Sequence, residues 1–448
     1  MRITWAQPED LVAHELVALG DEGIVPENII NAWRDAGGSL IAQVSGASPI
    51  GADCHLRELA RTILHELDTL DNPARIEAVF DAPDFKDGVK LRENQWDTYM
   101  VRVRGAWYGR LVGCVSGKPV EKIPRQGIRA IAQATGNWPI HGYFTQEGLP
   151  GDIAERWPWN RRSRVNSLVE NINGTPEDDD INYPLLALEL LETKGPEFTS
   201  DDVAQLWLDN LPAGRVFTAE RAAYRNLLDA RPVPECGHRL NPFREWIGAL
   251  IRADVFGWTN PGKPHRAAYL AWKDARISHS RNGIYGEMWA AALCSAAMSE
   301  STISEALDVS LTVISSTSAL HEAVTFGREC AASTTDCEAG LDALHDRYGH
   351  HHWVHVLNNA ATIAFALEFS GGDFWKGIHA GVAAGWDTDS VGATIGGVIG
   401  AFCGLNGIGD EYTAPLNNSI ATSLPGKNGC SIDDVIARTV ALARANND

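Results

Sequence analysis

The sequence predicts an all-α fold, and three observations point to it. Apolar residues recur at helical spacing in six stretches, which are 185–192, 202–209, 286–298, 303–314, 354–369 and 432–445. Short breakers separate such stretches, at Lys194-Gly195-Pro196, 260–264 and 371–373. Alternation of apolar and polar residues between turn signals, which is typical of strands, is nearly absent. We therefore expect a compact bundle of many helices.

Residues 1–95 are expected to form an N-terminal helical arm that packs on a catalytic domain spanning 96–448. The arm is rich in charge and carries no cluster of reactive side chains, and Asp81-Ala82-Pro83-Asp84 has the composition of a linker. The stretch 135–177 is too long for an ordinary loop inside a compact domain, and tryptophans lie among its Gly, Pro and Arg residues. We interpret this stretch as a lid over a functional site.

Two glycine ladders predict helices that approach another backbone closely. Glycines recur every four residues at 105, 109, 113 and 117, and again at 392, 396, 400 and 404. This spacing forms a stripe without side chains along one helix face. Glycine costs about 1 kcal/mol relative to alanine inside a helix, so tight helix packing must compensate for these choices.

The segment 390–409 has no charged residue and is long enough to cross a bilayer. However, it is rich in glycine, stands alone, and is flanked by Asp387, Asp389 and Asp410 rather than by basic residues. We expect a buried helix of a large α-helical protein and no membrane association.

Composition limits the classes of partner. The chain has 448 residues with 38 Lys and Arg against 58 Asp and Glu, which gives a formal net charge of −20. This balance disfavours nucleic acids and anionic membranes, because both attract basic surfaces. The N-terminal decapeptide lacks the apolar core of a signal peptide, and the eight cysteines form no CxxC pair. We expect a cytoplasmic protein without a disulfide framework or a zinc site.

Two acidic clusters stand at predicted helix starts. One is Glu177-Asp178-Asp179-Asp180, which precedes an apolar helical run, and the other is Asp387-Thr388-Asp389-Ser390, which precedes the uncharged segment. Acidic residues favour helix N-termini, so capping alone explains part of this pattern. Buried carboxylates repel one another unless a cation neutralises them, and oxygen ligands select Mg²⁺, Mn²⁺ or Ca²⁺. If the two clusters converge, they would suit a pair of divalent ions.

Three motifs in order resemble the ADP-ribosylglycohydrolase family over roughly residues 100–445. Residues 104–121, RGAWYGRLVGCVSGKPVE, are similar to the family's R-G-x-x-x-G-x-x-x-G-D-x-x-G-x-P-x-E. Asp178-Asp179-Asp180 stands in place of its T-D-D motif, and Gly385-Trp386-Asp387-Thr388-Asp389-Ser390 resembles its G-G-D-T-D-[TS] motif. The segments 241–249, 278–288 and 353–360 also read like the family, and Gly-Cys-x-x-Gly-Lys-Pro-Val-Glu suggests a distinct branch.

The resemblance implies an all-α hydrolase with a binuclear Mg²⁺ centre, or one with Mn²⁺, that cleaves the glycosidic bond of an α-linked ribose. It implies metal ligands Asp178, Asp179 and Asp180 on one side and Asp387, Asp389 and Ser390 on the other. Glu121 would be an acid/base or substrate-orienting carboxylate. Asp179 or Glu121 could take the proton of the attacking water, and the sequence leaves that choice open. The expected substrate contacts are Gly117, His279, Gly283, Tyr285, His355, Asn358 and Trp386.

The sequence departs from the family motifs at Asp178, where threonine is usual, and at Cys114, where aspartate is usual. The substrate is therefore left open between an ADP-ribosyl group, on a protein or a small molecule, and another ribosyl compound. A catalytically altered relative that binds a ribosyl ligand or serves a structural role is the alternative, because the family includes lens crystallins. A terpene-synthase-like enzyme is disfavoured, because it would need an N-D-x-x-S-x-x-x-E motif and the only Asn-Asp pair of the sequence is Asn447-Asp448 at the end. The oligomeric state stays open.

Several of these residues also have simpler interpretations. His351 and His355 have the i, i+4 spacing of metal ligands, but His350 to His352 fit a solvated helix start, and the position of His355 fits the lining of the pocket equally well. His279 is interpreted as a hydrogen-bonded core histidine unless its motif gives it a role in the site. Trp386 could wall the sugar site or only pack.

Overall fold

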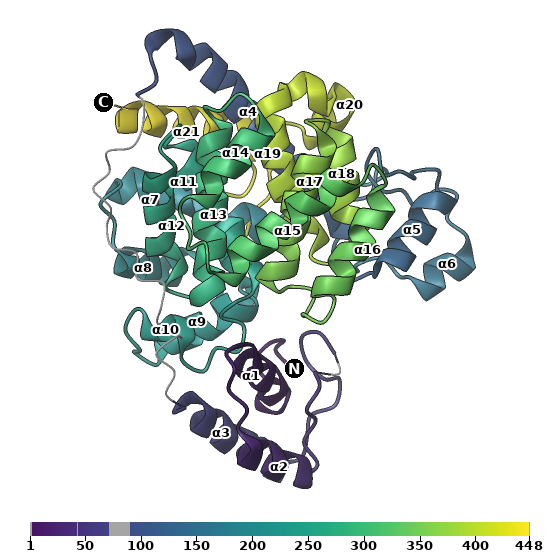
Figure 1. The fold of residues 1–448 in the computed structure, drawn as a ribbon, viewed down its shortest axis with the longest axis vertical. Helices are drawn as coiled ribbons and strands as arrows, with labels where there is room; N and C mark the ends of the chain where they lie inside the picture. Colours follow the sequence, from purple (N-terminus) through teal and green to yellow (C-terminus); the bar gives the residue numbers. More distant parts are fainter. Residues whose placement is uncertain (1, 43, 71–89, 448) are drawn as a thin grey trace.

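The computed structural model describes residues 2–42, 44–70 and 90–447, and the linker expected at 81–84 lies outside them. Helices are the main elements of the described residues (Figure 1). The α-helices are α1 (Pro8–Asp21), α2 (Glu27–Asp35), α3 (Cys54–Asp68), α4 (Trp96–Gly117), α5 (Arg125–Ala134), α6 (Gly151–Arg156), α7 (Asp179–Lys194), α8 (Ser200–Asn210), α9 (Thr218–Leu228), α10 (Glu235–His238), α11 (Asp254–Trp258), α12 (Pro264–Ala275), α13 (Arg281–Ala297), α14 (Ile303–Leu311), α15 (Ala319–Ser333), α16 (Cys337–Tyr348), α17 (Val356–Ser370), α18 (Phe374–Ala383), α19 (Thr388–Ile408), α20 (Asp410–Thr413) and α21 (Ile432–Asn447).

Shorter elements connect these helices. Five 3₁₀ turns occur in the described residues, and they are η2 (Glu93–Gln95), η3 (Lys118–Val120), η4 (Ala213–Arg215), η5 (Ile247–Arg252) and η6 (Ala414–Leu416). The named strands of the described part are β1 (Ser419–Ile420) and β2 (Cys430–Ser431), which pair antiparallel. The predicted all-α class is therefore confirmed.

The six apolar stretches correspond to α7, α8, α13, α14, α17 and α21. Side-chain caps explain several boundaries. Thr199 and Asp202 form a reciprocal capping box at the start of α8. The stretch predicted from residue 354 becomes helical only at Val356, because His355 is the N-cap and its side chain accepts the Leu357 N–H.

The two glycine ladders face each other in one antiparallel pair, α4 and α19. A Cβ on Gly105 would lie 2.0 Å from the carbonyl oxygen of Gly400, and one on Gly113 would lie 2.0 Å from that of Gly392. The expected close approach of backbones is therefore observed, and each ladder is the partner of the other. This register sets the C-terminal end of α4, with η3, beside the N-terminal end of α19.

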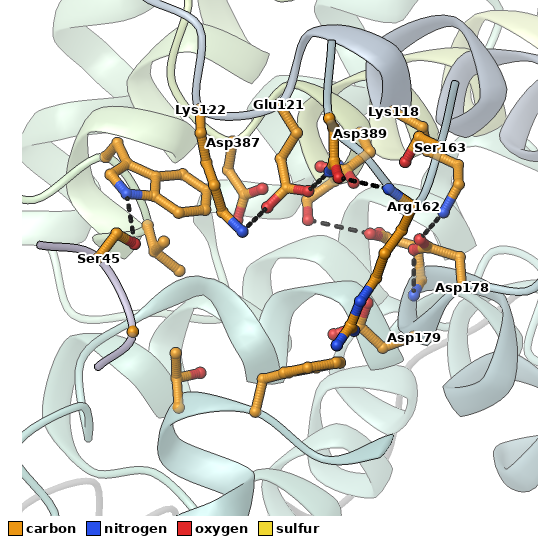
Figure 2. A pocket seen from close by; sticks show the side chains of 18 of the residues that line it. Ser45, Lys118, Glu121, Lys122, Arg162, Ser163, Asp178, Asp179, Asp387 and Asp389 are labelled. Atoms are coloured by element: carbon orange, nitrogen blue, oxygen red, sulfur yellow. Dashed lines mark hydrogen bonds and ion pairs between the residues drawn. The ribbon is translucent and has the colours of Figure 1, made fainter. Parts of the chain in front are cut away.

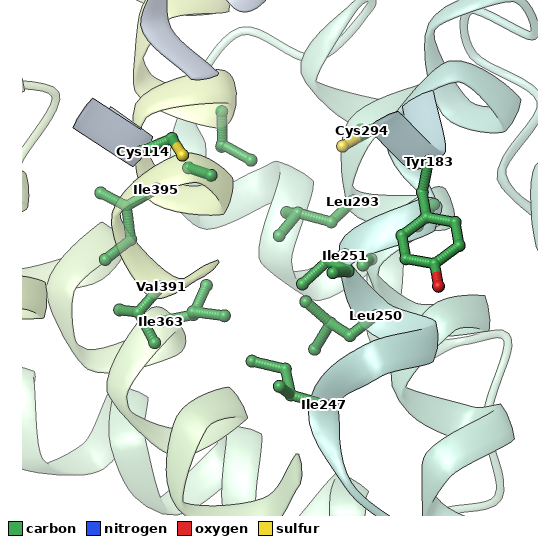
Figure 3. Close-up of a cluster of buried hydrophobic side chains, with 14 of the residues drawn as sticks. Cys114, Tyr183, Ile247, Leu250, Ile251, Leu293, Cys294, Ile363, Val391 and Ile395 are labelled. Carbon is green, nitrogen blue, oxygen red and sulfur yellow. The ribbon is translucent and has the colours of Figure 1, made fainter. Parts of the chain in front are cut away.

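The core lies between this pair and the surrounding helices. Buried side chains of α4, α7, α13, α17 and α19 meet around the 3₁₀ turn η5 (Figure 3). Ile247, Leu250 and Ile251 of η5 are at most 3% exposed. Because η5 is wedged between α7 and α13, it fixes the N-terminal end of α7 relative to α19.

Within the described residues, α19 alone has the length and apolar composition that would allow a helix to cross a membrane. Buried core helices pass the same test, and 72% of its apolar window is buried inside this structure. The predicted burial of this segment is therefore observed.

Helices α1 to α3 form the N-terminal arm at one end of the molecule (Figure 1). They enclose a small core of their own around Trp33 and Leu67. Ion pairs form one part of the contact between the arm and the rest of the chain. The buried Arg244 guanidinium lies 3.1 Å from Glu15 and 2.6 Å from Glu22. Trp5 packs edge-on against Phe243 and Trp246, which extends the main core into the arm.

Candidate active site

Both acidic clusters line one cavity of about 1280 Å³ (Figure 2). One cluster lies at the start of α7 and the other at the start of α19. The segment that follows α4, from Lys118 to Pro124, forms a third wall, and residues 157–166 of the long loop form a fourth. Stretches that are far apart in the sequence thus converge on one cavity, which an ion site shared by the two clusters requires.

Hydrogen bonds fix the starts of α7 and α19 beside the cavity. Asp178 is the N-cap of α7, and its side chain accepts the backbone N–H of Asp180 at 3.0 Å. At α19, the Thr388 hydroxyl donates to the Gly117 carbonyl oxygen at 2.9 Å, which locks the helix start onto α4. Each helix macrodipole favours the carboxylates at its own N-terminus.

Asp180 joins the two clusters directly. The Ser390 hydroxyl donates to Asp180 Oδ2 at 3.0 Å. The fully buried Arg110 donates to the Asp180 carbonyl oxygen at 2.7 Å, and its other side pairs with Asp254 at 2.8 Å. Asp180 is therefore braced from α4 and from α19, and it fixes the spacing between the two helix starts.

Lys118 enters the cluster as a buried cation. Its ammonium forms an ion pair and hydrogen bond with Asp178 and also donates to the Glu177 carbonyl oxygen at 3.2 Å. Burial alone would raise the pKa of Asp178, but the charge of Lys118 outweighs that effect and holds this pKa below its usual value. The same pairing raises the pKa of Lys118.

The other carboxylates of the cavity are poorly compensated. Burial and neighbouring carboxylates raise the pKa of Asp179 and Asp387 well above their usual range. Burial, Glu121 and Asp178 raise the pKa of Asp389 to about 7. Such a group is stabilised by a divalent cation, because the cation would neutralise charges that otherwise disfavour one another. Carboxylate and hydroxyl oxygens are the donors that a hard ion prefers. The ligand atoms that already lie within 4.8 Å of one another in this cavity are those of Cys114, Asp178 and Asp180.

Glu121 stands at the edge of the same cavity, just beyond η3. Asn160 of the long loop donates to Glu121 Oε2 at 2.6 Å, and Lys122 Nζ lies 3.2 Å from Glu121 Oε1. The loop expected to be a lid thus touches the carboxylate expected to act in proton transfer. Trp157 of this loop lines the cavity, whereas Trp138 packs on His379 away from it.

The two glycines expected to contact substrate are each packed against a neighbouring backbone. A Cβ on Gly117 would lie 2.1 Å from the Thr388 carbonyl oxygen, so this glycine is needed for the contact between α4 and α19. A Cβ on Gly283 would lie 2.4 Å from the Arg244 carbonyl oxygen. Neither residue belongs to the cavity lining, because each is covered by a neighbouring backbone.

The other expected substrate contacts also lie outside this cavity. His279 is buried behind its wall, with Nε2 at 4.0 Å from Glu220, and Asn358 is buried and donates to the His352 carbonyl oxygen. Trp386 stacks on His345 with ring centroids 4.1 Å apart and is not part of the cavity lining. These three side chains therefore pack in the layers next to the cavity, and Tyr285 also lies outside its lining and packs against the core. Their contact with substrate stays a prediction.

His355 belongs to the interface with the arm. It lines a smaller cavity of about 250 Å³, and its Nε2 lies 3.9 Å from Asp21 of α1. Together with His351, these residues offer ligand atoms within 4.8 Å of one another. Burial and the neighbouring imidazoles lower the pKa of His355 well below its usual value. His355 thus lines the smaller cavity and not the larger one, and its contact with substrate stays a prediction.

Sequence reasoning missed several residues of the cavity wall. The arm contributes Thr4, Trp5, Ser45 and Gly46, although its sequence shows no reactive cluster. Ser45 accepts a hydrogen bond from Trp353 Nε1 at 3.3 Å, which joins the arm to the cavity rim. Basic residues also line the wall, and they are Lys118, Lys122, Arg161, Arg162 and Arg215. The pair Arg161-Arg162 inside the predicted lid was the one local signal that could have indicated this lining.

The fold and the site define an all-α protein with a carboxylate-lined cavity at two helix N-termini. The family model described as ADP-ribosylglycohydrolase matches residues 95–447, and the chain belongs to this family. A solved structure titled "ADP-ribosylglycohydrolase-related protein complex" is 21% identical, with a TM-score of 0.48. The match covers 78% of this chain and 99% of that one. A comparison with curated protein sequences found no match.

Proposed function

We propose that this protein is a divalent-cation-dependent hydrolase that cleaves the glycosidic bond at the anomeric carbon of a ribosyl substrate. Membership of the family points to a glycohydrolase. The observation that supports the proposal most directly is the hydrogen bond from Ser390 to Asp180 at 3.0 Å, since it joins the two acidic clusters around one cavity. The substrate is an ADP-ribosyl group on a protein or small molecule, or a related ribosyl compound.

In this proposal Asp179, Asp387, Asp389 and Ser390 hold Mg²⁺, with Mn²⁺ as a substitute. The cation would stabilise developing negative charge and orient the ribose hydroxyls. The residues of the chain supply the remaining chemistry. Arg110 and Ser390 fix the position of Asp180, and the ladder contact between α4 and α19 fixes the separation of Glu121 from Asp389.

We assign proton transfer to Glu121, with Asp179 as the second candidate. Water attacks the anomeric carbon, the bond to the leaving group breaks, and a carboxylate takes a proton from that water and passes it to the departing group, which regenerates the carboxylate. Glu121 suits this role because Asn160 and Lys122 orient its carboxylate at the edge of the cavity. Asp179 lies deeper among like charges, which suits a cation ligand better.

The test is a hydrolysis screen of α-ribosyl compounds with and without Mg²⁺ or Mn²⁺, using ADP-ribosyl-arginine, ADP-ribosyl-serine and simple ribosides. We expect cation-dependent release of the free sugar from at least one of them. Glu121→Gln should lower the rate by about 10²-fold or more, whereas the exposed Glu147→Gln should not change it.

Binding of a ribosyl compound without cleavage by the wild-type protein, in the presence of either cation, would instead favour the ligand-binding alternative. The retained carboxylates support catalysis over that alternative. We further propose that the protein acts in the cytoplasm on a diffusible or protein-linked substrate, without nucleic acid or membrane partners.

A further inference from the structure

Lys118 places a permanent positive charge inside the acidic cluster, and the side chain is almost completely buried. Its ammonium contacts the Asp178 carboxylate (Figure 2). It also donates to the Glu177 carbonyl oxygen. The side chains of Lys118 and Asp178 are 7% and 9% exposed, so bulk water does little to screen this pair. The Lys118 charge therefore acts inside the site and is not screened like a charge on its solvated rim.

The potential ligands of the cavity divide into two sets. The first contains Cys114, Asp178 and Asp180, whose ligand atoms lie within 4.8 Å of one another. This set already has cations, because Lys118 pairs with Asp178 and Arg110 contacts Asp180 at 3.4 Å. The second set contains Asp179, Asp387 and Asp389. Among the described residues, no basic nitrogen lies within ion-pair distance of these three carboxylates.

From this division we propose that Lys118 is a built-in cation that takes the place of one metal ion, so that the cavity holds a single divalent cation at Asp179, Asp387 and Asp389. The inference rests on the proposed function, because it concerns the ion that the hydrolase would use. It differs from the binuclear centre that the sequence resemblance implies.

Two structural features keep Lys118 in this position. The residue belongs to η3, which follows α4 directly, and the contact of Gly117 with Thr388 fixes the end of α4 against α19. In addition, both oxygens of Asp178 are engaged, one by Lys118 and the other by the Asp180 N–H at 3.0 Å. A divalent ion in the first set would have to share Asp178 with the Lys118 ammonium, which the position of η3 holds beside that carboxylate. The repulsion between the two cations opposes that arrangement.

The sequence shows the same pairing. Aspartate occupies position 178 where the family motif has threonine, and lysine occupies the variable position of the Gly-x-Pro segment. The extra carboxylate and the extra ammonium are the two partners of one buried ion pair. Each residue therefore compensates the charge that the other adds to the site.

The experiment counts Mn²⁺ ions bound to the full chain. The protein is saturated with Mn²⁺, weakly bound ions are removed by gel filtration, and metal and protein are quantified, with electron paramagnetic resonance on the same samples. We expect one Mn²⁺ per wild-type chain and the spectrum of an isolated ion. The variant Lys118→Met frees the second position, and we expect two ions with an exchange-coupled spectrum.

Lys122→Met is the matched control, because it removes a lysine of the same cavity that pairs with Glu121 at 3.2 Å instead of entering the first set. It should still bind one ion. The double variant Lys118→Met/Asp178→Thr removes both partners together and avoids an unpaired buried charge if the single variant does not fold. It should bind two ions.

Two coupled ions in the wild-type protein would overturn the inference while leaving the proposed function intact. A second ion that is absent from both Lys118 variants would also overturn it. A wild-type protein that binds no Mn²⁺ would refute the proposed function as well, so the two failures are distinguishable.

Discussion

Gly109 and Gly396 lie face to face where α4 and α19 pack, and a Cβ on Gly109 would lie 2.0 Å from the Gly396 carbonyl oxygen. The contact is between backbones, so no side-chain movement can relieve an added methyl group. Because the same helix pair positions Lys118 and Glu121 against Asp387 and Asp389, the geometry of the site depends on this packing.

Gly109→Ala is therefore expected to lower the free energy of unfolding by about 3 kcal/mol, since it forces the two helices apart. Urea denaturation measures this loss. The control is Gly20→Ala in α1, where a Cβ would meet nothing within 4 Å, and it should gain about 0.5–1 kcal/mol from helix propensity. Equal effects of the two substitutions would contradict the packing role of the ladders.

Asp389→Asn should abolish the stabilisation of the protein by divalent cations and reduce hydrolysis by about 100-fold or more. The reason is the loss of a charged oxygen ligand at the N-terminus of α19. Thermal unfolding with and without Mg²⁺ checks the first effect. Asp336→Asn changes an exposed N-cap of α16 in the same way and should keep the full Mg²⁺ response. An unchanged Mg²⁺ response in Asp389→Asn would remove this residue from the ligand set.

Asn160→Ala should lower kcat by about 10-fold while leaving Mn²⁺ binding unchanged, because it deletes the 2.6 Å hydrogen bond to Glu121 and no cation ligand. Steady-state kinetics and the metal count test the two parts separately. Asn173→Ala, which removes an exposed partner of Asn417, is the control. Loss of Mn²⁺ binding in Asn160→Ala would mean that this loop organises the cation site instead.

Arg244→Met should destabilise the protein by about 3–5 kcal/mol, since it leaves the carboxylates of Glu15 and Glu22 buried without the guanidinium between them. We expect faster proteolysis within residues 2–70, measured by limited digestion. Arg239→Met alters another charged contact of the arm, to Asp68 at 3.2 Å, but Arg239 is 36% exposed and should cost less than about 1 kcal/mol. Equal digestion of both variants would argue against Arg244 as the anchor of the arm.

His379 predicts an acid-dependent loss of stability. Burial lowers its pKa to about 4, and its Nδ1 accepts the Ile140 N–H at 3.1 Å. In the unfolded chain this imidazole binds a proton near pH 6.5, whereas in the native protein it stays neutral down to about pH 4. The contribution of His379 to the free energy of unfolding is therefore full above pH 6.5 and decreases as the pH falls. Between pH 7 and pH 5 the loss is about 2 kcal/mol. His379→Asn keeps an acceptor and should show a smaller decrease over that interval in urea denaturation, and an unchanged pH dependence would contradict this role.

Much of the fold follows from local patterns. The apolar spacing predicted the principal helices because helix formation depends on residues three and four apart. The breaker at Lys194-Gly195-Pro196 correctly marked the boundary between α7 and α8. The glycine ladders predicted close backbone contact, although the sequence could not show that each ladder is the partner of the other. Charge alone also gave the correct location of the acidic clusters at helix starts.

The candidate site was predictable only in part. Motif resemblance directed attention to Asp179, Asp389 and Glu121, which do line the cavity. The same resemblance also selected Gly117, Gly283 and Trp386, which pack against neighbouring chain segments. A motif contains residues that support the site as well as residues that face it, and sequence spacing does not distinguish the two.

By itself, the sequence determined the helical class, the acidic character of the site and the family resemblance, because these depend on the identity and spacing of nearby residues. Tertiary structure alone decided that Lys118 neutralises Asp178, that Asp180 bonds to Ser390, and that the arm reaches the cavity through Ser45. Burial and pairing of charges arise from contacts between distant segments. Those contacts exist only after the helices have packed, so no local pattern encodes them.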